Sequence, residues 1–260
     1  MNSARTAALG DELHQALLTH LPVAPLTERG LELSVEEAYG IQRHIVARRV
    51  EAGEVLVGRK IGLTSEAVQA ALHVREPDFG CLLSGMVYNS GEAVACATLI
   101  QPRAQGEIAF ILKRDLIGPG VTRGDVLRAT DYLMPCFEIV DSRIRDWRIK
   151  IQDAVADNAS SGVLVLGDRV VDPARVDLRL CGMVLEKNGE VVDTGAGAAV
   201  LGHPANAVAW LANTLGQLGT ALRAGEIILS GSLAGLVPLQ AGDNLQMTIG
   251  GIGGCSVRFS

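Results

Sequence analysis

The order of apolar and polar positions predicts two helices followed by a long series of strands. Over residues 4–20 apolar side chains recur at helical spacing, and a second helical pattern follows a proline-containing loop. Ser34 and Glu37 have the spacing of a capping box at the start of that second helix. The pattern therefore predicts a helical N-terminal segment over 1–53 and a separate β-roll domain over 54–260.

Beyond residue 53 the pattern changes to short apolar and β-branched runs separated by glycine. Asn188-Gly189, between two such runs, is typical of a two-residue hairpin turn. A short helix is expected over 65–73, and a late helix from about Pro204 to Leu218. Strands are expected over 55–63, 86–88, 92–96, 99–113, 132–141, 162–166, 180–187, 190–194, 226–230, 244–249 and 255–259.

This series of elements favours one class of fold. Many strands, few helices and no regular alternation of strand with helix argue against a doubly wound parallel sheet. We expect an α+β fold in which a mixed β-roll or barrel carries helices at its edge. The several strand edges of such a roll also favour association into an oligomer, which would cover them.

Composition narrows the function classes. The chain has 260 residues, 48% of them hydrophobic, which is enough for a large core. Its net charge is −6 without any Lys/Arg cluster, so a nucleic-acid partner is not expected. No apolar run reaches the roughly 18 residues of a membrane span, and the N-terminus lacks a signal-peptide pattern. The five scattered Cys are typical of reduced thiols, so a cytoplasmic location is expected.

Three polar side chains in otherwise apolar strands form the most informative pattern. Gln105 and Glu107 alternate with apolar neighbours, so on a strand they share one face, and Glu138 lies in a second apolar run. A carboxylate is costly to bury unless it is paired or bound to a metal. The pattern indicates an oxygen site for a hard divalent cation. The alternative is a Glu107 on an exposed edge strand and a Glu138 paired with an arginine.

Two further residues suggest chemistry. Lys60 lies between Gly58 and Gly62, and it could approach an anionic substrate or exchange protons if desolvation lowered its pKa. A solvated lysine at a strand end is the simpler interpretation. Asp78 lies in Pro77-Asp78-Phe79-Gly80, which is typical of a turn.

Two loops are polar and dense in charge or hydroxyl groups. The loop over 157–162 carries small polar residues whose hydroxyls and backbone N–H groups could form an anion-binding nest. The loop over 141–147 is rich in charge, and it is either a set of mutual ion pairs or a substrate anion site.

Several stretches of the chain together form a recognisable set of motifs. They are Gly58–Thr64, Glu76–Gly80, Gln101–Phe110, Glu138–Trp147, Val155–Ser160, Leu201–Pro204 and Leu229–Ser232. In this order they resemble the 2-hydroxypenta-2,4-dienoate hydratases, also called 2-oxopent-4-enoate hydratases, of the fumarylacetoacetate hydrolase superfamily. The resemblance extends from about residue 9 to residue 259.

The resemblance implies a fold and a cofactor. The fold is the mixed β-roll of the fumarylacetoacetate hydrolase type with an N-terminal helical segment. The cofactor is Mg²⁺ or Mn²⁺, held by an E-x-E pair and a third glutamate that fall on Gln105, Glu107 and Glu138. Gln105 departs from the family pattern, which has Glu at that position. An amide oxygen brings no charge, so weaker cation binding is expected.

The resemblance also implies the remaining site residues. Its pocket lysine falls on Lys60 and its acidic turn on Asp78, and these two are expected to be catalytic. Substrate-binding positions are expected at Arg59, Asp157, Asn158 and Ser160.

The reaction implied is hydration of 2-hydroxypenta-2,4-dienoate to 4-hydroxy-2-oxopentanoate in the meta-cleavage pathway of aromatic catabolism. A cation would stabilise negative charge on the carboxylate and enol oxygens of the substrate. A proton is delivered to carbon 5 and water adds at carbon 4, with Lys60 and Asp78 as the expected proton carriers.

Two alternatives stay open from the sequence. One is 4-oxalocrotonate decarboxylase, which shares the fold and metal but typically has His-Pro-Lys where this chain has Gln101-Pro102-Arg103. The other is a weakly active partner subunit in a complex of hydratase and decarboxylase. A homo-oligomer is expected in either case, and the sequence sets neither the number of subunits nor the chain length of the substrate.

Overall fold

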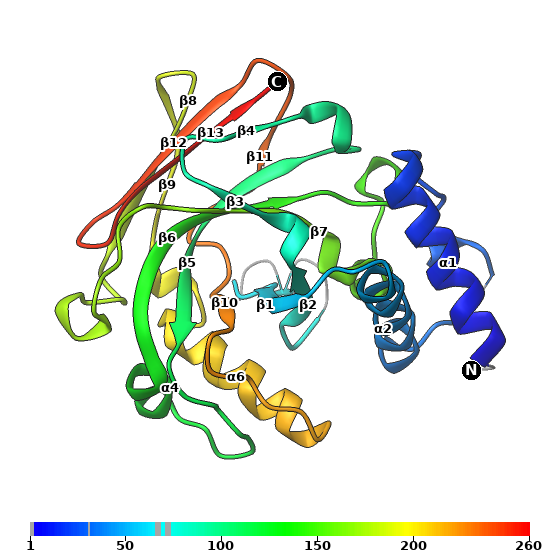
Figure 1. Ribbon diagram of the computed structural model, residues 1–260, viewed down its shortest axis with the longest axis horizontal. Coiled ribbons are helices and arrows are strands. Elements are labelled where there is room, and N and C mark those ends of the chain that lie inside the picture. Colours follow the sequence, from blue (N-terminus) through cyan, green and yellow to red (C-terminus); the bar gives the residue numbers. More distant parts are fainter. Residues whose placement is uncertain (1–2, 31, 66–68, 71–73) are drawn as a thin grey trace.

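Helices lie at the periphery of a β-rich molecule in the computed structural model (Figure 1), which describes residues 3–30, 32–65, 69–70 and 74–260. The helix expected over 65–73 lies mostly outside the described residues. None of the described helices has the length and hydropathy of a transmembrane span. The helices are α1 (Ser3–Thr19), α2 (Val35–Glu51), α4 (Arg123–Ala129), α5 (Ile151–Ala156) and α6 (Pro204–Gln217).

The three predicted long helices are confirmed, with their ends where the sequence signals lie. Ser34 and Glu37 form the expected capping box at the start of α2. His203 caps α6, since its Nδ1 accepts a hydrogen bond from the backbone N–H of Ala205 at 3.1 Å. α4 and α5 were not predicted, because helices of seven and six residues are too short to show a helical period.

The described strands form two sheets. Figure 1 shows the smaller sheet near one end of the molecule and the helices α1 and α2 side by side near the other. The larger, eight-stranded sheet has the order β2 (Asp78–Leu83), β1 (Leu56–Gly62), β10 (Ile227–Leu229), β5 (Arg103–Leu112), β6 (Thr130–Val140), β7 (Ser161–Leu166) and β3 (Val87–Asn89), with β11 (Val237–Pro238) paired to β5. The five-stranded sheet has the order β4 (Ala93–Val94), β13 (Gly253–Phe259), β12 (Asn244–Ile249), β8 (Gly182–Lys187) and β9 (Glu190–Ala196).

The larger sheet curls on itself. β2 and β7 stand near opposite ends of its strand order, yet they pack against each other. Among the described residues these two strands share no hydrogen-bonded ladder, so the sheet is an open roll rather than a closed barrel. The predicted α+β fold with a mixed β-roll is therefore confirmed, and the barrel form is not adopted.

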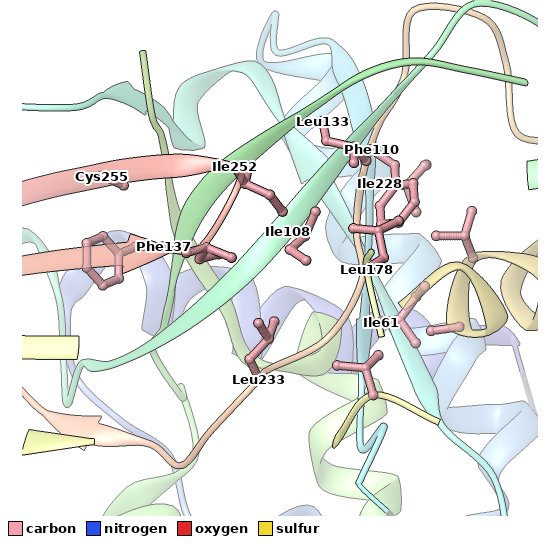
Figure 2. Close-up of a cluster of buried hydrophobic side chains, with 14 of the residues drawn as sticks. Ile61, Ile108, Phe110, Leu133, Phe137, Leu178, Ile228, Leu233, Ile252 and Cys255 are labelled. Carbon is pink, nitrogen blue, oxygen red and sulfur yellow. The ribbon is translucent and has the colours of Figure 1, made fainter. Parts of the chain in front are cut away.

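One large hydrophobic cluster packs on the outer face of this roll (Figure 2). Ile108 and Phe110 of β5 and Phe137 of β6 contribute fully buried side chains to it. Met247 of β12 and Leu211 of α6 belong to the same cluster, so it joins the roll to the smaller sheet and to α6. Because side chains alternate along a strand, residues 105, 107 and 138 point to the opposite, inner face.

One predicted turn is in fact a strand. Asp78 begins β2, which pairs antiparallel with β1, whereas the sequence suggested a turn over 77–80. β2 is buried on both faces, so it lacks the alternation of polar and apolar residues that marks a half-buried strand. The hairpin predicted at Asn188-Gly189 is confirmed, with φ of 56° and 85° at the two residues.

A glycine sets how closely β2 approaches the loop before β7. A Cβ built on Gly80 would lie 2.5 Å from the backbone oxygen of Asn158 and 2.7 Å from Ser161 Oγ. We predict that Gly80→Ala lowers the free energy of unfolding by about 1–3 kcal/mol, because the backbone must shift. Urea unfolding measures this.

Gly182→Ala is the matched control for that experiment. Gly182 lies on an exposed part of β8, and a Cβ there meets nothing closer than 4.0 Å. Its substitution is expected to change stability by less than about 0.5 kcal/mol. Equal losses for the two variants would contradict the packing argument.

Candidate active site

Gln105, Glu107 and Glu138 lie together on the inner face of the roll, as the sequence predicted. Gln105 of β5 stands directly opposite Glu138 of β6, and Glu107 is the next residue on the same face. Their exposed fractions are 8%, 0% and 1%, so the alternative of an exposed Glu107 is excluded. Gln105 Nε2 donates hydrogen bonds to Glu107 Oε1 at 3.0 Å and to Glu138 Oε2 at 2.5 Å. The amide thus bridges the two carboxylates.

Lys60 of β1 contacts this cluster across the concave inner face of the curled sheet. Its Nζ lies 3.1 Å from Glu138 Oε1, and the residue is 3% exposed, so it is not a solvated lysine. Burial acts to lower the pKa of Lys60, but the charges of Glu138, Asp78 and Glu107 outweigh it and the pKa is raised. The expectation that desolvation would lower this pKa is therefore wrong, because three carboxylates surround the ammonium.

Asp78 completes the charged group from the first position of β2. It pairs in register with Gly62, and a Cβ on Gly62 would lie 2.2 Å from Asp78 Oδ1. The missing side chain at Gly62 is therefore what admits the carboxylate. Burial raises the pKa of Asp78, although Lys60 acts in the opposite direction. Asp78 Oδ1 has no hydrogen-bond partner among the described residues.

The buried cluster of Lys60, Asp78, Glu107 and Glu138 has more acidic groups than basic ones. Lys60 interacts with the carboxylates of Glu138, Asp78 and Glu107, which outnumber it. Burial, and then the neighbouring Glu138, raise the pKa of Glu107 well above its ordinary value. The backbone N–H of Gly231 acts in the opposite direction, because it donates to Glu107 Oε2 at 2.8 Å and so lowers this pKa. In the sequence, the only signal for this role of Gly231 is a glycine in a short polar motif that follows a strand.

The residues present fit a hard divalent cation. Two buried carboxylates face each other, and Glu138 Oε1 has Lys60 Nζ at 3.1 Å but no hydrogen bond of good geometry from the described residues. In the described part of the chain no group of three or more His, Cys, Asp or Glu side chains is placed to hold a metal. The carbonyl oxygen of Gln105 would therefore have to complete the ligand set.

A cavity of about 200 Å³ opens beside Gln105. Leu63, Ala234 and Leu236 give it apolar walls, while Thr64 and Ser232 add hydroxyl groups. The described residues that line it include no Lys, Arg or His. The cavity therefore suits a small molecule whose far end is uncharged.

The predicted substrate-binding residues lie apart from this cavity. Arg59 is the residue before Lys60 on β1, so its side chain points to the opposite face of the sheet. In the ladder between β1 and β2, Arg59 stands opposite Cys81. Asp157 is fully buried, and it accepts hydrogen bonds from Arg143 Nε at 2.5 Å and from the Arg143 backbone at 3.0 Å. This pair favours mutual ion pairing over substrate binding for the charged loop over 141–147.

The side chains of Asn158 and Ser160 already make hydrogen bonds within the protein. The Asn158 side chain accepts from the backbone N–H of Cys81 at 2.8 Å and donates to the carbonyl of Cys81 at 2.9 Å. Ser160 Oγ donates to Asp157 Oδ2 at 3.3 Å. In this arrangement the loop supports β2, and substrate contacts by Arg59, Asp157, Asn158 and Ser160 stay predictions.

Comparison with known proteins places this geometry in context. The family model "Fumarylacetoacetate (FAA) hydrolase C-terminal" matches residues 56–260. A 2-hydroxyhexa-2,4-dienoate hydratase of Comamonas testosteroni is 56% identical over 253 residues, which are 96% of each chain. A 2-hydroxypent-2,4-dienoate hydratase of Pseudomonas putida is 63% identical over 214 residues, 82% of this chain and 96% of the relative.

A solved structure is similar over the whole chain. It is 4-oxalocrotonate decarboxylase from Pseudomonas putida G7, complexed with magnesium and adipate. The two chains are 39% identical with a TM-score of 0.97, and the match covers 100% of this chain and 99% of the other. The resemblance inferred from the sequence motifs is confirmed.

Substitution of Asp78 tests whether its buried carboxylate destabilises the fold. Because its pKa is raised on folding, its ionised form costs stability at neutral pH, and that cost disappears as the pH falls below its ordinary pKa of 3.8. We predict that Asp78→Asn increases the stability of EDTA-treated protein at pH 7, and that the gain shrinks as the pH is lowered. Urea unfolding across a pH series measures it.

Asp243→Asn is the control with the opposite sign. Asp243 is buried, but hydrogen bonds from Lys187 and Asn188 outweigh the effect of burial and lower its pKa. Its ionised form therefore stabilises the fold at neutral pH, and the substitution is expected to destabilise the protein there. A loss of stability in Asp78→Asn at pH 7 would refute the argument.

Proposed function

Because the chain belongs to the fumarylacetoacetate hydrolase family, we propose that it adds water to 2-hydroxypenta-2,4-dienoate to give 4-hydroxy-2-oxopentanoate. The reaction belongs to the meta-cleavage pathway of aromatic catabolism. The observation that carries the proposal is the buried group of Lys60, Asp78, Glu107 and Glu138 beside a small cavity, in a chain whose relatives over most of its length are dienoate hydratases.

The proposed hydration requires the buried residues to bind a cation and to transfer protons. A Mg²⁺ or Mn²⁺ ion, held by Gln105, Glu107 and Glu138, would supply Lewis-acid stabilisation of negative charge on the substrate oxygens. Lys60 stays protonated beside Glu138 and orients that carboxylate. Its ammonium, buried beside the carboxylates of Glu138, Asp78 and Glu107, is also the proton donor of this group.

Asp78 is suited to exchanging protons. Burial raises its pKa towards the range in which a carboxyl group both takes up and releases a proton. We assign delivery of the proton to carbon 5, and activation of the water that adds at carbon 4, to the pair of Lys60 and Asp78. Their shared face on β1 and β2 lets both act on one substrate.

The cavity favours a monocarboxylate over a dicarboxylate. Substrates of the dienoate hydratases carry one carboxylate, whereas a dicarboxylate would need a second cationic partner. The described lining residues include no basic side chain that could provide one. Decarboxylation of 4-oxalocrotonate is the second candidate, because the decarboxylase structure is so similar to this chain. Only that reaction releases CO₂.

Assembly is part of the proposal. We propose a homo-oligomer and association with a 4-oxalocrotonate decarboxylase, which would pass an unstable dienol directly to this site. A role as a weakly active partner subunit follows if Gln105 prevents cation binding.

The activity test uses the absorbance of the dienol. Purified protein is expected to consume 2-hydroxypenta-2,4-dienoate in the presence of Mg²⁺, and not after EDTA treatment. Incubation with 2-oxohex-3-enedioate is expected to release no CO₂. Release of CO₂ without loss of the dienol would overturn the proposal in favour of the decarboxylase.

Lys60→Met tests the proton-transfer assignment. The variant is expected to lose about 10²-fold or more in kcat, because it lacks both the donor and the partner of Glu138. Lys113→Met, at an exposed lysine at the end of β5, is the matched control and should keep wild-type kcat. Near-normal turnover by Lys60→Met would show that the proton carrier lies elsewhere.

A further inference from the structure

We propose that Gln105 is a neutral latch on the cation site: its amide N–H groups hold Glu107 and Glu138 together, and a cation binds only after the amide rotates to present its carbonyl oxygen. The inference rests on the cation site of the proposed function. It concerns how this chain controls that site rather than which reaction it performs.

The latch is visible in two hydrogen bonds made by one nitrogen. Gln105 Nε2 lies 3.0 Å from Glu107 Oε1 and 2.5 Å from Glu138 Oε2. In the opposite orientation the amide oxygen would face Glu107 Oε1 and Glu138 Oε2, and both hydrogen bonds donated by Nε2 would be lost. The donor groups of the amide and a cation therefore compete for the same carboxylate oxygens.

Each carboxylate has a second anchor that does not depend on the amide. Glu107 Oε2 accepts from the backbone N–H of Gly231 at 2.8 Å. Glu138 Oε1 lies 3.1 Å from Lys60 Nζ. Rotation of the amide would therefore leave both carboxylates in place, still facing each other.

The amide also has room to rotate. Gln105 is part of the lining of the 200 Å³ cavity, whereas Glu107 and Glu138 are more deeply buried. The latch thus has two arrangements with opposite polarity. In one it donates to the carboxylates, and in the other it joins them as a third oxygen ligand.

A carboxylate at position 105 would remove the latch. Gln105→Glu replaces the donor with a third buried negative charge beside Glu107 and Glu138. Without a cation this crowding destabilises the fold, and with a cation it strengthens binding. The latch therefore makes the protein stable without its cation, at the expense of affinity.

The experiment measures Mg²⁺ binding and stability on the full-length protein. Calorimetric titration of EDTA-treated protein with MgCl₂ is expected to show about tenfold or more tighter binding to Gln105→Glu than to wild type. Thermal unfolding in EDTA is expected to occur about 5 °C lower or more for Gln105→Glu, with recovery in excess Mg²⁺.

Gln42→Glu is the matched control for a buried glutamine. Gln42 is 2% exposed, and its Nε2 donates to the backbone oxygens of Phe79 at 2.9 Å and Val155 at 3.1 Å. This variant is also expected to unfold at a lower temperature, but Mg²⁺ should restore it no more than it stabilises wild type. The comparison separates a latch from the general cost of a buried carboxylate.

Three outcomes would overturn the inference. Equal Mg²⁺ affinity in wild type and Gln105→Glu would refute the latch, and so would equal stability of the two in EDTA. In either case dienol turnover by wild type would still support the hydratase. Absence of Mg²⁺ binding to both proteins would overturn the cation site itself, and the latch with it.

Discussion

The ion pair between Lys60 and Glu138 depends on the curl of the larger sheet, and the rest of the site depends on that pair. β1 and β6 are separated by β10 and β5 in the strand order. In a flat sheet they would stand about 14 Å apart, beyond easy reach of the two side chains. The observed 3.1 Å therefore requires a concave inner face. The outer face supplies the packing for that curvature, because the large hydrophobic cluster fills the space between the roll, the smaller sheet and α6.

A buried ion pair of this kind contributes little to stability in itself, since desolvation offsets most of its attraction. What matters more is that neither Lys60 nor Glu138 can be replaced alone without leaving the other charge buried and unpaired. Removing the ammonium would leave Glu138 facing Glu107 with only the Gln105 amide between them. The fold thus keeps an arrangement of charge that works against its own stability, which is what a site prepared for a cation and an anionic substrate requires.

The sequence predicted the part of this site that follows from alternation along single strands. Gln105 and Glu107 had to share a face, and the apolar neighbours of Glu138 indicated burial. What alternation cannot supply is the pairing between distant strands. Lys60 therefore looked like a solvated lysine and Asp78 like a turn residue, because the neighbours that bury them come from β2, β5 and β6. Short helices such as α4 and α5 escaped detection for a different reason, which is their length.

The join between β2 and β7 differs in kind from every ladder in the roll. There the backbone of Cys81 is bonded on both sides by one side chain, that of Asn158, rather than by a neighbouring strand. Gln42 Nε2 adds a hydrogen bond to the carbonyl of Phe79 at 2.9 Å, and Leu82 of β2 packs in one buried cluster with Leu164 of β7. Asn158 thus takes the place of a partner strand at this edge of β2, and it helps to keep Asp78 beside Lys60 although the roll does not close.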